Sequence, residues 1–166
     1  MTVDPSLRVR RSAVLVTGMS GTGKSTVLAE LARRGHRVVD TDDPGWIVAT
    51  PDGAEPTWDL ERVSALLAGH RAGRLFVAGC VANQGTLYDR FDAVVLLSAP
   101  LDVLLARVAD RANPFGRRPE DRARIAADLA EVEPLLRAGA DHELVTTQPL
   151  EAVVAALEDI AADPVP

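Results

Sequence analysis

A glycine-rich turn lies between an apolar segment and an amphipathic one in residues 14–31, VLVTGMSGTGKSTVLAEL. Gly18, Gly23, Lys24 and Ser25 follow the spacing G-x-x-x-x-G-K-[ST] of a phosphate-binding loop. Backbone N–H groups can surround a phosphate only where no Cβ obstructs them, and glycine alone takes positive φ without steric cost. The helix after the loop directs its unpaired N–H groups at the same anion. The segment therefore predicts a strand, a loop and a helix that bind the phosphates of a nucleotide.

The residue types in this loop predict separate tasks. We expect Lys24 to reach the β- and γ-phosphates and the Ser25 hydroxyl to bind Mg²⁺, which prefers hard oxygen ligands. Thr26 is placed to contact the α-phosphate. The alternative is a glycine-rich turn with a chance lysine, but a buried strand before it and a helix after it favour the nucleotide site. The predicted nucleotide-binding residues of the loop are Gly18, Ser20, Gly21, Thr22, Gly23, Lys24, Ser25 and Thr26.

Apolar runs alternate with segments of helical periodicity along the rest of the chain. This pattern is typical of an α/β fold, with a parallel sheet covered by helices on both faces in three layers. The five predicted strands are 13–17, 37–40, 75–79, 93–98 and 142–146. The predicted helices are 24–34, 59–68, 101–111, 119–138 and 149–161. Residues 41–57 and 112–121 are rich in proline, glycine and charge, which predicts two irregular loops.

Length and composition limit the class of protein. A chain of 166 residues predicts one domain, with a core over about residues 12–160. No apolar run approaches the roughly 18 residues of a membrane span, no signal peptide is expected, and one cysteine cannot form an internal disulfide. We therefore expect a cytoplasmic protein without a membrane partner. The net charge of −6 makes nucleic acid an unlikely partner.

Two aspartates follow the second predicted strand. Ligands of open α/β sheets lie at the carboxyl ends of the strands, where phosphoryl transfer needs carboxylates. We expect Asp40 to serve the metal and Asp42 to accept the proton of an attacking hydroxyl, because residues i and i+2 of an extended segment point the same way. The alternative is ordinary turn chemistry in Asp-Asp-Pro-Gly, to which Asp43 more naturally belongs.

An arginine-rich segment joins the third and fourth predicted helices. We expect residues 112–121 to form a lid over ATP, with Arg117 and Arg118 on the phosphates as catalytic residues. Arg107 is expected to flank the adenine and Arg111 to bind the nucleotide. For Arg122 and Arg124 the favoured interpretation is a solvated helix face.

Uncharged polar residues after the third strand are candidates for contact with the phosphate acceptor. Asn83, Gln84 and Tyr88 supply donors and acceptors there, and Trp46 in the 41–57 loop is equally suited to stacking on a ring or to loop packing. Cys80 is better explained as a small buried residue than as a nucleophile.

The motif set resembles that of the P-loop kinases of small molecules, the group of nucleoside monophosphate kinases, shikimate kinase and gluconate kinase. GMSGTGKST, the DTD after the second strand, RVADR with FGRRPED, and VTTQPLEAVVAAL carry the resemblance. It implies a five-stranded sheet in the order 2-3-1-4-5, Asp40 on magnesium, Asp42 as base, and an adenine site bordered by Thr147, Gln148 and Pro149.

The sequence therefore predicts an ATP- and Mg²⁺-dependent kinase of a small molecule, either a monomer or a homodimer. An ATP-dependent regulatory switch is the main alternative, and a kinase of nucleic-acid ends is a weaker one. No N-K-x-D and no L-S-G-G-Q occurs, and the third strand closes in VAGC rather than in an aspartate. These absences disfavour GTPases, transporter ATPases and motor ATPases.

Overall fold

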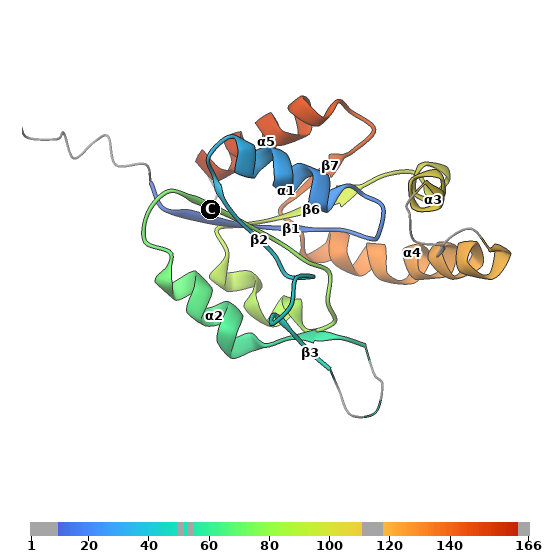
Figure 1. The fold of residues 1–166 in the computed structure, drawn as a ribbon, viewed down its shortest axis with the longest axis horizontal. Helices are drawn as coiled ribbons and strands as arrows, with labels where there is room; N and C mark the ends of the chain where they lie inside the picture. Colours follow the sequence, from blue (N-terminus) through green and yellow to red (C-terminus); the bar gives the residue numbers. More distant parts are fainter. Residues whose placement is uncertain (1–9, 50–51, 53–54, 111–117, 163–166) are drawn as a thin grey trace, which may run out of the picture.

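A computed structural model describes residues 10–49, 52, 55–110 and 118–162, and Figure 1 shows its fold. Five parallel strands form the central sheet, in the order β2-β5-β1-β6-β7. When only the five strands of this sheet are numbered along the chain, the order is 2-3-1-4-5, as predicted. Their bounds are β1 (Ser12–Thr17), β2 (Arg37–Asp40), β5 (Arg74–Ala78), β6 (Ala93–Ser98) and β7 (His142–Val145).

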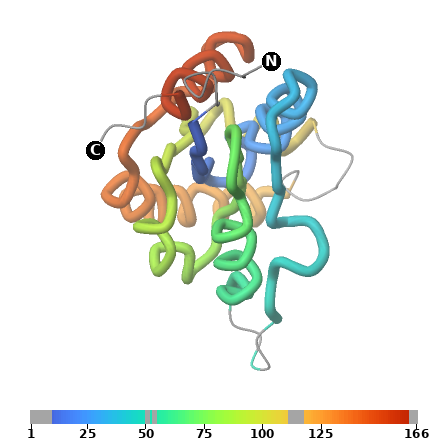
Figure 2. The backbone as a smooth tube through the Cα atoms, turned by 90° about the vertical axis from the view of Figure 1, so that its left-hand side faces the viewer, coloured from blue at the N-terminus to red at the C-terminus, as the bar shows by residue number. Residues whose placement is uncertain are grey.

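Helices cover both faces of this sheet, as the three-layer prediction requires (Figures 1 and 2). Two of them, α1 (Lys24–Arg33) and α5 (Leu150–Ala162), lie on one face. On the other face lie α2 (Leu60–Gly69), a 3₁₀ helix (Gln84–Arg90) and α4 (Pro119–Gly139), while α3 (Leu101–Ala109) lies at the end of the sheet. Every predicted helix is present, with ends that differ by at most two residues.

Burial of the middle strands explains why they appear as apolar runs in the sequence. All six residues of β1 and all six of β6 are buried, because helices cover both sides of a parallel sheet. Two apolar clusters result, one between the sheet and α1 with α5, the other between the sheet and α2 with the 3₁₀ helix. The order of the sheet brings the carboxyl ends of β2, β5 and β1 side by side. Three loops therefore meet at one edge.

The expected irregular loop 41–57 contains regular structure, which corrects that prediction. β3 (Ile47–Val48) and β4 (Thr57–Trp58) pair antiparallel as a short hairpin. The Trp58 side chain is 2% exposed, and its Nε1 donates a hydrogen bond to Thr41 Oγ1 at 3.0 Å. The Asn83 amide holds the Trp58 backbone from both sides, at 2.8 and 3.1 Å. The hairpin is therefore fixed to the carboxyl edge of the sheet.

Among the described residues, no helix is both long and apolar enough to cross a membrane.

Candidate phosphate and acceptor site

The loop between β1 and α1 has the backbone of an anion-binding turn. Gly18, Gly21 and Gly23 all have positive φ, at 154°, 88° and 99°. A Cβ on Gly18 would lie 2.4 Å from the carbonyl oxygen of Leu97 in β6, so only glycine fits against that strand. The Thr22 hydroxyl donates to the Met19 carbonyl at 2.8 Å and closes the turn. The loop therefore has the conformation that phosphate binding requires.

A cavity of about 300 Å³ lies at the start of α1. The helix begins at Lys24, with Gly23 as its N-cap and no capping side chain. Its first N–H groups point at this cavity with the positive end of the helix dipole. The cavity is lined by Ser20, Gly21, Gly23, Lys24, Ser25, Thr26 and Asp42. Six of these seven residues belong to the predicted phosphate loop, which the structure thus gathers around one space.

The Lys24 ammonium lies over the same loop. Its Nζ donates hydrogen bonds to the carbonyl oxygens of Gly18 and, at 3.1 Å, Met19. These contacts hold a positive charge beside the cavity, where the terminal phosphates of a nucleotide would be. The described position of Lys24 fits its predicted role.

The residues predicted for magnesium lie in contact. Ser25 Oγ donates a hydrogen bond to Asp40 Oδ2 at 3.2 Å, which links α1 to the last residue of β2. Asp40 Oδ1 accepts a hydrogen bond from the Asp42 backbone N–H at 3.0 Å, which orients the carboxylate. No group of three or more possible metal-ligating His, Cys, Asp or Glu side chains exists within the described part of the chain. Mg²⁺ beside nucleotide phosphates needs only one or two protein oxygens and keeps several waters, so Ser25 and Asp40 fit it.

A second cavity, of about 470 Å³, extends from the loop on the side of α5. It is lined by Gly21, Thr22, Gly23, Thr26, Val27, Arg107, Thr146, Gln148, Leu150 and Val153. Its mixed polar and apolar wall suits a nucleoside. Thr147 and Pro149 are not among its lining residues, whereas their neighbours Thr146, Gln148 and Leu150 are.

Arg107 braces this cavity from α3. Its guanidinium donates to the Gly21 carbonyl at 3.1 Å and to the Thr22 carbonyl at 3.4 Å. It also donates to Thr146, at 2.9 Å to the hydroxyl and 2.7 Å to the carbonyl. Arg107 therefore ties the phosphate loop to the loop after β7, a positioning role that the sequence did not indicate.

A third cavity, of about 390 Å³, adjoins the phosphate cavity on its other side. Ser20, Lys24 and Asp42 line both spaces, so they form a shared wall. The remaining lining residues come from the hairpin loop, the exit of β5 and α4, apart from Met19 in the phosphate loop. They are Met19, Glu55, Pro56, Cys80, Val81, Ala82, Arg124, Asp128, Val132 and Leu136.

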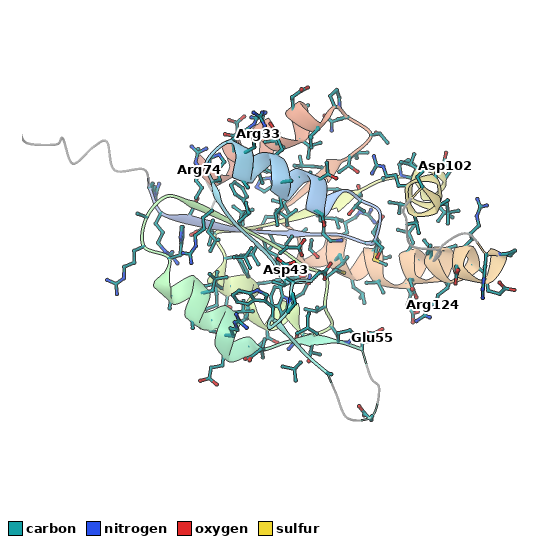
Figure 3. The ribbon with its side chains drawn as sticks, viewed as in Figure 1. Arg33, Asp43, Glu55, Arg74, Asp102 and Arg124 are labelled. Atoms are coloured by element: carbon teal, nitrogen blue, oxygen red, sulfur yellow. The ribbon has the colours of Figure 1, made fainter. Side chains whose placement is uncertain are left out.

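Several residues of this third cavity were not predicted as site residues from the sequence. Arg124 and Asp128 lie one helical turn apart on α4 and line the cavity, and Arg124 is exposed, in agreement with the expected solvated helix face. Figure 3 shows Arg124 and Glu55 toward the same end of the molecule, on α4 and beside the hairpin. No ion pair involving Glu55, Arg124 or Asp128 occurs among the described residues. The i, i+4 spacing of Arg124 and Asp128 could be seen in the sequence. The sequence did not show that this face of α4 lies beside the phosphate loop.

Cys80 also lines the third cavity and is neither fully buried nor a reactive thiolate. Burial raises the pKa of its thiol above the ordinary value, although the charge of Lys24 acts in the opposite direction. A raised pKa favours the protonated thiol over the thiolate.

The uncharged acceptor candidates after β5 turn out to be occupied within the chain. Asn83 holds the Trp58 backbone, as described above. Gln84 is 2% exposed, donates to Thr17 Oγ1 at 2.9 Å and to Tyr88 Oη at 2.8 Å, and accepts from the Val81 N–H at 3.0 Å. Because these amide groups have internal partners, we correct their assignment to the acceptor: they support the walls of the site.

Tyr88 and Trp46 likewise lie outside the lining of the third cavity. A Cβ on Gly139 would be 2.5 Å from the Tyr88 ring, so Tyr88 packs against the end of α4. The Arg62 guanidinium lies 4.4 Å from the centre of the Trp46 ring, which favours loop packing over stacking on a substrate.

The predicted lid is described only in part. Arg118 is the N-cap of α4, and its carbonyl accepts the Arg122 N–H at 3.1 Å. Arg111 and Arg117, like residues 112–116, lie outside the described residues.

Comparisons with known proteins identify the family and the fold of this chain. A model of the family described as AAA domain matches residues 14–127, from β1 into α4. The structure of shikimate kinase from Acinetobacter baumannii in complex with shikimate is similar to this chain, with a TM-score of 0.63 and 20% sequence identity. The match covers 92% of this chain and 93% of that chain. Shikimate kinase from Bacteroides thetaiotaomicron is 18% identical with a TM-score of 0.61 and coverage of 90% and 97%.

A sugar kinase from a Janibacter species is 21% identical, with a TM-score of 0.56 and coverage of 93% of this chain and 97% of that chain. At such identities the likeness shows a shared fold. The search of curated protein sequences gave no significant match.

Proposed function

Since the chain belongs to the AAA domain family, whose P-loop it carries intact, we propose that it is an ATP-dependent kinase of a small molecule. In this proposal it transfers the γ-phosphoryl group of ATP to a hydroxyl or phosphate group of an acceptor. The shikimate and sugar kinases that share its fold support this reaction class. A cytoplasmic location remains part of the proposal.

One observation carries the proposal: the phosphate cavity and the third cavity share a wall that contains Lys24 and Asp42. A transferase needs the donor phosphate and the acceptor in adjoining spaces, with a proton acceptor at the junction. A protein that only binds or hydrolyses ATP needs no second cavity there. Asp42 is exposed and stands at this junction, where it can accept the proton of an attacking hydroxyl.

The charged residues divide the remaining work. The third cavity is the proposed acceptor cavity. The Lys24 ammonium on α1 and the Arg124 guanidinium on α4 line it and can neutralise charge on the transferring group. Ser25 and Asp40 would hold Mg²⁺, which would supply positive charge against the charge that develops on the phosphates. Arg107 holds the phosphate loop and the Thr146 loop at a fixed separation. In this proposal Arg111 remains a nucleotide-binding residue, and Arg117 and Arg118 remain catalytic residues on the phosphates.

The regulatory switch is the second candidate. It requires the phosphate loop but gives no role to Asp42 or to the third cavity. A motor ATPase is disfavoured because β5 is followed by Gly79 and Cys80, without a carboxylate for a water nucleophile. A kinase of nucleic-acid ends is disfavoured by the net charge of −6.

The test compares Asp42→Asn with Asp43→Asn, which removes the same charge one residue away and outside all described cavities. Label transfer from [γ-³²P]ATP to pooled cell metabolites should fall about 10²- to 10⁴-fold in the Asp42 variant, the usual contribution of a general base. ATP affinity should be unchanged, and Asp43→Asn should keep wild-type transfer. Wild-type transfer by both variants would reject Asp42 as the general base, and no transfer by a wild-type protein that binds ATP would reject the kinase proposal.

A further inference from the structure

The acceptor cavity carries more negative than positive side chains. Its charged lining consists of Lys24 and Arg124 against Asp42, Glu55 and Asp128. Three of these residues are assigned to phosphoryl transfer in the proposed function, namely the two cations and the base. Glu55 and Asp128 have no task in that chemistry.

These two carboxylates come from separate elements that the fold holds in place. Glu55 lies on the segment that leads into β4, whose Trp58 is anchored to Thr41 and Asn83. Asp128 lies on α4, whose Ile125 and Leu136 are buried. Both side chains belong to exposed residues, and neither has an ion-pair partner in the ranges that the structure describes. They are therefore available to a bound molecule.

The charge balance excludes one kind of acceptor. The terminal phosphate of ATP brings negative charge to the shared wall, where it engages Lys24 and Arg124. An acceptor with its own carboxylate or phosphate would then face Glu55 and Asp128 without a remaining cation in the described lining. Like charges in one cavity disfavour binding and select against such partners.

The rest of the lining is largely apolar. Val81, Val132 and Leu136 stand on facing elements, at the exit of β5 and along α4. A space of about 390 Å³ is near the lower end of the range for small-molecule pockets, roughly 300 to 1,000 Å³. The cavity therefore suits a compact molecule with an apolar body.

From these contacts we infer that the acceptor is an alcohol that carries an amine, with its ammonium group bound by Glu55 and Asp128. Its hydroxyl lies at Asp42, and its apolar body lies against Val81, Val132 and Leu136. In the transfer step the hydroxyl oxygen bonds to the γ-phosphorus, the bond from that phosphorus to the bridging oxygen of ADP breaks, and Asp42 takes the hydroxyl proton. This inference rests on the proposed function and adds the substrate class to it.

The test separates metabolites by charge before the reaction. A cell extract is divided by ion exchange into cationic, neutral and anionic fractions, and each is incubated with the full chain, Mg²⁺ and [γ-³²P]ATP. We expect labelled product from the cationic fraction. Product from only the neutral or the anionic fraction would overturn the inference and leave the kinase proposal standing. No product from any fraction, in a protein that binds ATP, would reject both.

Variants then test the two carboxylates. Glu55→Gln and Asp128→Asn should each lower the rate of label transfer from the diluted cationic fraction at least tenfold, with ATP affinity unchanged within twofold. Glu131→Gln is the matched control, because Glu131 is an exposed acid on the same helix outside the cavity. It should keep the wild-type rate. Wild-type rates in both cavity variants would overturn the assignment of Glu55 and Asp128.

Discussion

Replacing Arg107 by methionine keeps the apolar stem of the side chain and removes its guanidinium. Three hydrogen bonds shorter than 3.2 Å are lost, to the Gly21 carbonyl and to the hydroxyl and carbonyl of Thr146. Gly21 and Thr146 are both buried, so water cannot replace the lost donor fully. A hydrogen bond to a charged group contributes about 1.5–3 kcal/mol, and a buried acceptor without a partner costs about 1–3 kcal/mol.

Because these terms share one side chain and do not add, we expect Arg107→Met to lower the free energy of unfolding by about 2–4 kcal/mol. With a urea m-value of roughly 2 kcal/mol/M, the unfolding midpoint falls by about 1–2 M. The phosphate loop also loses its connection to the loop after β7, so ATP should bind at least tenfold more weakly, or about 1.4 kcal/mol.

Urea unfolding followed by circular dichroism measures the first effect, and calorimetric titration with ATP below the unfolding transition measures the second. The control is Arg33→Met, which removes an arginine from the exposed ion pair with Glu30 on α1 and should leave both quantities near wild type. An unchanged midpoint would refute the energetic argument. A lowered midpoint with unchanged ATP affinity would refute the positioning role.

Two further predictions concern the packing of the hairpin and the contact between α1 and α5. Gly79→Ala should lower the free energy of unfolding by about 1–3 kcal/mol in urea unfolding, because the new Cβ would lie 2.3 Å from Thr41 Oγ1 and 3.2 Å from the Trp58 ring. Gly69→Ala is its control: nothing lies within 4 Å of that Cβ, so the helix should gain about 0.4–1 kcal/mol. Hydrogen bonds from His36 and Arg34 hold the pKa of Glu158 below its usual 4.5, so the carboxylate stabilises the fold above that pH and stops doing so as the pH falls through its lowered pKa. Glu158→Gln should therefore reduce stability by at most about 1 kcal/mol at neutral pH, and the difference from wild type in thermal unfolding should vanish in acid; a constant difference down to pH 2 would contradict this origin.

Regular elements were predictable because their patterns are local. The fully buried β1 and β6 contain the unbroken apolar runs AVLV and AVVLL, and the spacing from Gly18 to Ser25 identifies the phosphate loop. The β3–β4 hairpin was missed because its strands have two residues each, too few to show periodicity. It is held instead by Thr41, Asn83 and the buried Trp58, contacts between residues far apart in the chain.

The candidate site shows the same division. The donor side was predictable from the sequence because the loop, the lysine, Ser25 and the two aspartates form recognisable motifs within 25 residues, and the sheet order that the resemblance implied places them at one edge. The acceptor side became visible only in the folded chain. Packing placed Arg124 and Asp128 of α4 and Glu55 beside the hairpin in the lining of the cavity that Asp42 also lines, and it gave Asn83 and Gln84 internal partners. Packing between distant segments decides which face of a helix lines a cavity and whether a side-chain amide has a partner within the chain. No local sequence pattern records that packing.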